Sequence, residues 1–132
     1  MMKTTTRNII KNDVKLSLKQ ILVELSSILP CEDYIWSILD FDGIGKTPNG
    51  ETMPEFEKTV RNSITGYRLN WEELSRFAST LTDTHDCLVV GAKSENDLVM
   101  NELDKDDFTR CKIVIDYHDS TLLTIMTRLR TY

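Results

Sequence analysis

Two carboxylates stand one residue apart where an apolar stretch ends. Residues 34–39 are rich in side chains that favour strands, and they lead directly into Asp40, Phe41, Asp42 and Gly43. Two carboxylates projecting from the end of a strand can share a hard divalent cation, and one of them can attack phosphorus. The pair is therefore the first candidate for chemistry in this chain.

Residues 38–43 resemble the first motif of the haloacid-dehalogenase-like phosphotransferases. The resemblance implies that Asp40 is a nucleophile, that Asp42 is an acid/base and that both lie near Mg²⁺. Two features depart from the family pattern, since Ile44 stands where the family has threonine and few residues follow Asp40 in a chain of 132. We keep this activity as the alternative to the function preferred below.

A second phosphate motif overlaps the first. Residues 43–47 look like the end of a nucleotide-binding P-loop, and residues 113–116 could serve as its magnesium-coordinating strand. Asp40 and Asp42 would repel the phosphates, and Pro48 disfavours the helix that must begin at Lys46 and Thr47. We therefore expect no nucleotide binding.

Histidine and cysteine are too sparse to predict a metal centre. His85 and Cys87 provide two ligands, whereas a structural zinc site needs four. Cys31, Cys87 and Cys111 are widely spaced and form no Cys-x-x-Cys pair, which predicts reduced cysteines in the core. We expect no metal, no cofactor and no catalytic residues, and hence a protein that is not an enzyme.

Hydrophobic periodicity predicts one domain of about three helices packed on a small, mostly antiparallel sheet, an α+β fold over residues 1–132. The chain is 40% hydrophobic and 28% charged, which is typical of a folded domain. Asn70 and Glu73 have the spacing of a capping box. Helices are predicted over 14–29, 53–64 and 71–81, and strands over 34–39, 87–91 and 110–117.

The remaining segments connect these elements or stay open. Residues 43–52 and 82–85 are predicted loops, and residues 119–120 a turn. Residues 93–107 fit a short helix or an irregular excursion, and residues 121–131 fit a returning hairpin strand better than a helix. Residues 1–12 are expected to be a flexible basic segment. The chain has no apolar run of membrane-spanning length and no signal-peptide pattern, so we expect a cytoplasmic protein that does not contact membrane.

The net charge of −5 hides an uneven distribution. Residues 24–107 carry 18 acidic against 7 basic side chains, whereas residues 1–23 carry 5 basic and 1 acidic. A field of one sign accelerates encounter with oppositely charged partners. The acidic centre therefore predicts a basic protein partner and no direct contact with nucleic acid, although a solvated surface explains the same charges.

Residues 70–81, a short polar turn and residues 86–91 resemble the helix–turn–strand unit of small bacterial immunity proteins, including those of contact-dependent growth inhibition. Residues 113–116 with 119–120 are similar to a strand and turn near the end of some of them. The resemblance implies stoichiometric inhibition of a cognate toxin, frequently a basic nuclease. A non-enzymatic adaptor is the third possibility. We expect acidic side chains to imitate phosphates on the toxin at Asp40, Asp42, Glu51, Glu55, Glu57, Glu72 and Glu73.

Overall fold

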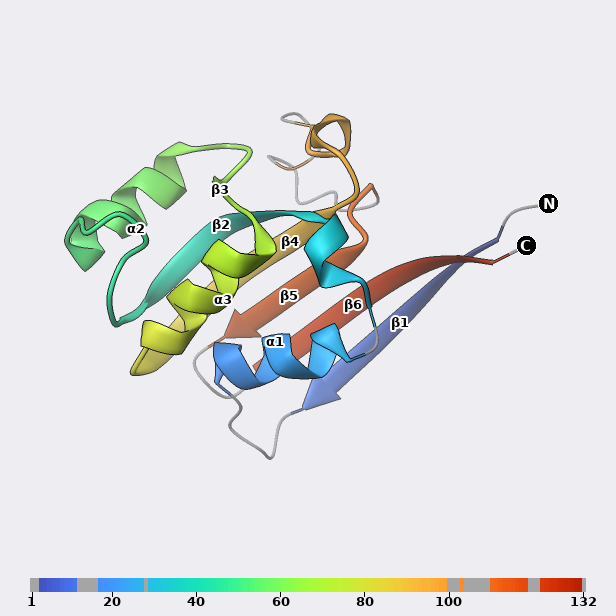
Figure 1. Ribbon diagram of the computed structural model, residues 1–132, viewed down its shortest axis with the longest axis horizontal. Helices are drawn as coiled ribbons and strands as arrows, with labels where there is room; N and C mark the ends of the chain where they lie inside the picture. The colour runs from blue at the N-terminus through green and yellow to red at the C-terminus, as the bar shows by residue number, and fades with distance from the viewer. Residues whose placement is uncertain are drawn as a thin grey trace.

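The strands of the chain form one antiparallel sheet in the order β1-β6-β5-β4-β2-β3 (Figure 1). The structure, a computed structural model, describes residues 3–11, 17–27, 29–99, 103, 110–118 and 122–131. The described elements are β1 (Lys3–Lys11), α1 (Leu18–Ser26), η1 (Cys31–Asp33), β2 (Ile35–Ile44), α2 (Met53–Asn62), β3 (Tyr67–Leu69), α3 (Trp71–Thr80), β4 (Asp83–Ala92), η2 (Glu95–Asp97), β5 (Ile113–His118) and β6 (Leu122–Thr131). Three helices and an antiparallel sheet confirm the predicted α+β class.

Capping side chains set where the helices begin. Asn70 Oδ1 accepts a hydrogen bond from the Glu73 backbone N–H at 2.8 Å, and Glu73 Oε1 accepts from the Asn70 N–H at 3.0 Å. This capping box confirms the predicted start of α3. The Thr52 side chain caps α2 by accepting a hydrogen bond from the Glu55 backbone N–H, and Ser17 forms a capping box with Gln20 at the start of α1. α1 ends at Ser26, earlier than predicted, and residues 14–16 lie outside the described residues.

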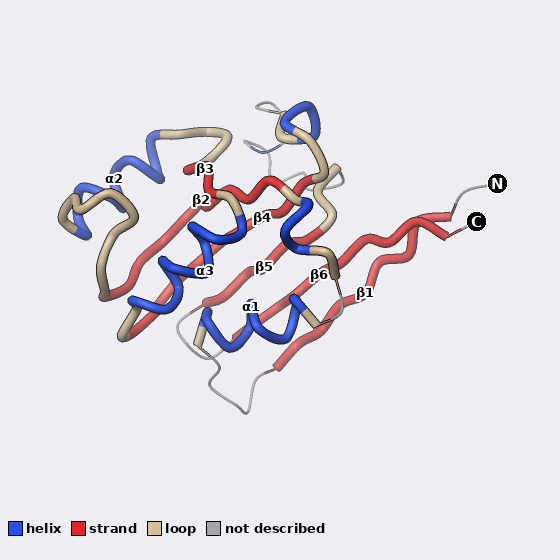
Figure 2. Tube along the Cα trace, viewed as in Figure 1, coloured by secondary structure: helices blue, strands red, loops and turns tan. Residues whose placement is uncertain are grey.

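The first apolar cluster lies between the sheet and the helices. α1 and α3 cross one face of the sheet, and α2 lies beside β2 (Figures 1 and 2). Phe41 of β2, Phe56 of α2 and Phe77 of α3 form an aromatic centre with ring centroids 5.1 to 5.9 Å apart. Trp36 is fully buried, and its indole Nε1–H donates to the Cys31 carbonyl at 3.0 Å. All three helices contribute side chains to this cluster.

A second, smaller apolar cluster lies on the opposite face of the sheet. Val90 and Val114 are direct partners in β4 and β5, and both belong to it. Leu98, Leu103 and Cys111, from the segment between these strands, pack against them and are nearly inaccessible to solvent. β5 is therefore buried on both faces along part of its length, whereas the alternating sequence predicted a strand with one solvated face.

Several boundaries differ from the predictions because strand pairing extends past the turn-like residues. β2 continues through Asp40, Asp42 and Ile44, and β4 begins at Asp83, so neither a strand end after Leu39 nor a loop over 82–85 is correct. Lys3–Lys11 forms β1 and pairs with β6, which corrects the expected flexible segment. β3 was not predicted. β6 confirms the returning hairpin strand. Of the segment 93–107, residues 93–99 and 103 are described, and η2 lies among them. The predicted turn at 119–120 lies outside the described residues.

Replacing Gly66 with alanine is expected to destabilise the fold. Gly66 has φ +86°, and an added Cβ would lie 2.1 Å from Ser37 Oγ. We expect the free energy of unfolding to fall by about 3 kcal/mol, because the backbone conformation and the packing against β2 are both penalised. Gly50 has φ +81° with open space around it, so Gly50→Ala should cost only about 1 kcal/mol. Urea unfolding measures the free energy of unfolding of both variants. Equal losses in the two variants would contradict the close packing of Gly66 against Ser37.

Candidate functional site

A β-bulge turns the Asp40–Asp42 pair away from the core. The pairing of β2 with β4 shifts by one residue between Ile38 and Asp40. Strict alternation would place Asp40 on the same side as Trp36 and Ile38, which are fully buried against the helices. The bulge instead directs Phe41 into that cluster and leaves Asp40 and Asp42 exposed. Both carboxylates therefore project from the middle of a strand.

Neighbouring strands add carboxylates to the same face. Asp42 is directly opposite Asp86 of β4, and Asp40 is opposite Leu88, which is in turn opposite Asp116 of β5. Directly opposed residues of antiparallel strands point to the same face of a sheet. Burial raises the pKa of the Cys87 thiol, and the charges of Asp40, Asp116 and Asp86 add to this effect. We call Asp40, Asp42, Asp86 and Asp116 the acidic face.

Two members of the acidic face, Asp86 and Asp116, were not among the predicted partner residues. Asp116 follows buried Ile115 in β5, and Asp86 precedes buried Cys87 in β4. Because neighbouring side chains of a strand point to opposite faces, the sequence pattern places both aspartates on the face away from the helices. Alternation assigns a side chain to one face of its own strand, but only the register between strands brings the four carboxylates together. No register could be read from the sequence.

Glu57 of α2 lies next to Asp42 at the outer edge of β2. Glu57 Oε2 accepts a hydrogen bond from the Gly43 backbone N–H at 3.3 Å, beyond the point where β3 stops pairing. Burial raises the pKa of Glu57, and the nearby Asp42 carboxylate raises it further, against the opposing effect of the Gly43 hydrogen bond. His85 also reaches this edge, with Nδ1 3.8 Å from Asp42 Oδ1 and Nε2 3.2 Å from Asp83 Oδ2.

Glu51 and Glu73 lie near Tyr67, away from the acidic face. Burial raises the pKa of the Tyr67 hydroxyl, and both carboxylates contribute. The Asn49 amide donates to the Tyr67 hydroxyl, and these two side chains with Glu73 line a polar pocket of about 290 Å³. Glu73 also closes the capping box of α3. This group is therefore tied into local structure.

The last two predicted partner residues support helices. Glu55 accepts a hydrogen bond from the Thr52 hydroxyl at the start of α2, at 2.9 Å. Glu72 pairs with Arg76 one turn along α3, also at 2.9 Å. The structure thus brings together Asp40, Asp42 and Glu57 and does not bring Glu51, Glu55, Glu72 or Glu73 into the same group.

The phosphate and metal motifs have a different geometry from the one that their chemistry requires. Asp40 lies inside an antiparallel pair of strands, and the next helix after Thr47 begins only at Met53. Within the described residues, no three histidine, cysteine or acidic side chains are grouped to hold a metal ion.

Cys31, Cys87 and Cys111 are buried as predicted, and burial raises the pKa of Cys31 to about 11. No helix in the described part of the chain could span a bilayer.

The Glu57→Gln variant tests whether burial and the nearby Asp42 carboxylate make the ionised form of Glu57 unfavourable. The folded protein raises the pKa of Glu57 above its usual value near 4.5, so it binds this proton more tightly than the unfolded chain does. Ionisation of Glu57 therefore costs stability as the pH rises through the folded-state pKa. The glutamine variant should be more stable than the wild type at neutral pH and lose that advantage below about pH 4. Unfolding curves at both pH values measure this, and an advantage independent of pH would contradict it.

The chain matches no protein-family model, no curated protein and no solved structure. Among the described residues, carboxylates from three adjacent strands gather on one face of the sheet.

Proposed function

We propose that this chain is an immunity protein that binds a basic toxin domain, such as a nuclease, through the acidic face and neutralises it. The single observation that carries the proposal is the register of β2, β4 and β5, which places Asp40, Asp42, Asp86 and Asp116 on one side of the sheet. Strands hold side chains more rigidly than loops do, so the charges are arranged before the partner arrives. Such a surface favours rapid, selective association with a cationic protein.

Like charges stand side by side on the acidic face. Asp42 and Asp86 are direct cross-strand partners, and like charges in this position destabilise a sheet. Glu57 lies close enough to Asp42 to add to the repulsion. A local conflict of this kind is typical of functional sites. A cationic side chain of the partner would relieve this repulsion on binding.

The spacing of the carboxylates suits an extended array of cationic groups. Residues two apart along a strand are separated by about 7 Å, and direct cross-strand partners by about 5 Å. Asp40 and Asp42 provide the first spacing, and Asp42 and Asp86 provide the second. A nuclease surface that binds phosphates presents lysine and arginine side chains for anionic groups, and the acidic face offers carboxylates in place of those phosphates.

The proposal is tested with the toxin domain encoded next to this gene. Its association rate with the wild type should exceed that with the Asp40→Asn/Asp42→Asn variant about tenfold at low salt, and the difference should shrink as salt rises. The wild type should protect cells that express the toxin, and the variant should protect them less.

A charge-matched control separates the acidic face from net charge. Glu32→Gln/Asp33→Asn removes two exposed carboxylates from η1. This control should keep the wild-type association rate to within about twofold, because charge alone has little effect away from the interface. Unfolding measurements must show that both double variants are folded. Equal slowing by the two variants, or a toxin domain that neither binds nor is neutralised, would refute the proposal.

A further inference from the structure

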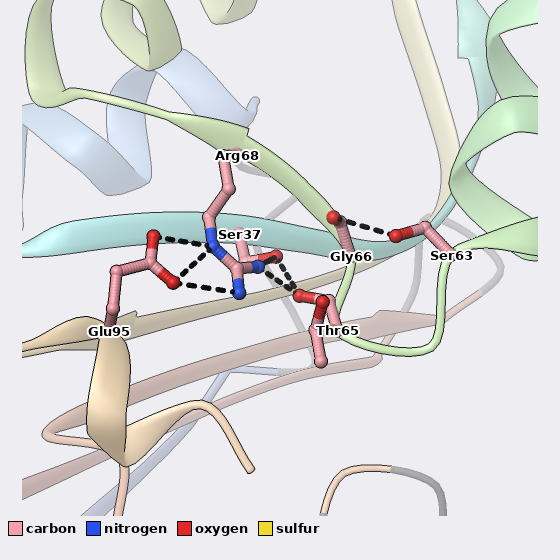
Figure 3. Close-up of polar contacts among 6 residues, drawn as sticks. All are labelled: Ser37, Ser63, Thr65, Gly66, Arg68 and Glu95. Carbon is pink, nitrogen blue, oxygen red and sulfur yellow. Dashed lines mark hydrogen bonds and ion pairs between the residues drawn. The ribbon is translucent and has the colours of Figure 1, made fainter. Parts of the chain in front are cut away.

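Arg68 of β3 is the centre of a polar network that joins the sheet to η2 (Figure 3). Its Nε lies 2.9 Å from Glu95 Oε1, and its Nη2 lies 3.1 Å from Glu95 Oε2, so the two side chains form a bidentate ion pair. Its Nη1 donates to Ser37 Oγ at 2.9 Å and to the Thr65 carbonyl. Ser37 is fully buried and also donates to the Thr65 carbonyl, at 2.6 Å. The network therefore ties the sheet to a segment that follows β4.

That segment, residues 93–99, is here called the strap. Leu98 of the strap is 6% exposed and packs into the second apolar cluster with Val90 and Val114. Arg68, Ser37, Val90 and Val114 are successive cross-strand partners, so the ion pair and the cluster lie along one row of the sheet. The strap thus covers the end of this row.

Contacts between the strap and the other described residues are few. Within the described part of the strap, Ser94 and Asp97 bond to each other, whereas the Glu95 side chain bonds to the sheet through Arg68. Leu98 provides a buried apolar contact, and the Val99 carbonyl accepts a hydrogen bond from the Leu103 backbone N–H at 2.9 Å. The first apolar cluster contains no strap residue, so the packing of the helices does not depend on the strap.

We propose that the Arg68–Glu95 ion pair is a latch that holds the strap over the second apolar cluster, and that the strap opens locally when the pair is broken. Segments with few buried contacts open at a lower free energy than the core does. The inference concerns a conformational device of this fold and does not rest on the proposed toxin partner.

Three buried cysteines provide the readout. Cys111 belongs to the second cluster and is 1% exposed, whereas Cys31 and Cys87 belong to the first and are each 2% exposed. Alkylation by N-ethylmaleimide, followed by mass spectrometry of each cysteine-containing peptide, measures how often each cluster opens. Comparing every cysteine with itself across variants removes differences in intrinsic thiol reactivity.

We expect Arg68→Met and Glu95→Gln each to accelerate alkylation of Cys111 about threefold, because the Glu95 side chain is 60% exposed and solvent screens the ion pair. Cys31 and Cys87 should keep their wild-type rates. Methionine retains the apolar stem of Arg68, and Glu95→Gln leaves the bonds of Arg68 to Ser37 and Thr65 intact. Agreement between the two variants therefore assigns the effect to the ion pair.

Arg76→Met is the matched control. It breaks the Arg76–Glu72 pair, which has the same 2.9 Å separation but lies on the exposed side of α3. This variant should leave all three alkylation rates unchanged. Wild-type protection of Cys111 in both latch variants would overturn the proposal. Acceleration of all three cysteines together would also overturn it, because the ion pair would then stabilise the whole fold.

Discussion

The β-bulge in β2 is the constraint on which the rest of the molecule depends. With Trp36 and Ile38 buried against the helices, an unbroken strand would place Asp40 in the core and Phe41 in solvent. Burying an unpaired carboxylate costs several kcal/mol, so that register would not be stable. The extra residue at the bulge reverses the two orientations, so that Phe41 faces the core and Asp40 faces solvent. Phe41 then completes the aromatic centre, and the carboxylates leave the core together.

The two faces of the sheet differ strongly in what packs against them. One face is covered by helices and carries the large aromatic side chains. The other is divided along its strands, because Val90 and Val114 pack beneath the strap while Asp86 and Asp116 lie further along the same two strands. Apolar packing beneath the strap stabilises this face, and the carboxylates of Asp42 and Asp86 repel each other further along it. The apolar residues that stabilise this face and the carboxylates of the proposed binding surface thus lie in different parts of it.

Local sequence signals predicted the elements whose ends they determine. Asn70 and Glu73 fix the start of α3 through bonds within four residues, and the alternation in β5 shows which of its side chains face the helices. The Asp-Phe-Asp-Gly stretch was misjudged because these residue types favour turns, whereas pairing with β4 and the packing of Phe41 hold them in a strand. Long-range pairing overrode local preference there.

The candidate site was predicted only in part for the same reason. Asp40 and Asp42 are neighbours in sequence, so their proximity was visible, and Glu57 was included because the acidic segment was taken as a whole. Asp86 and Asp116 join them only through the register of three strands. Glu55 and Glu73 were predicted from their charge alone, but their carboxylates form hydrogen bonds at the starts of α2 and α3. Charge does not distinguish a glutamate that caps a helix from one that binds a partner.

We expect the acidic face to create a concentrated negative field on the side of the sheet away from the helices. Paramagnetic relaxation of methyl groups by a cationic nitroxide, compared with a neutral one, measures this field directly. Leu88 lies among the carboxylates, whereas Val23 is exposed on α1. The account predicts a clear preference of the cationic probe for the Leu88 methyls over those of Val23. Equal enhancement at the two residues would contradict it.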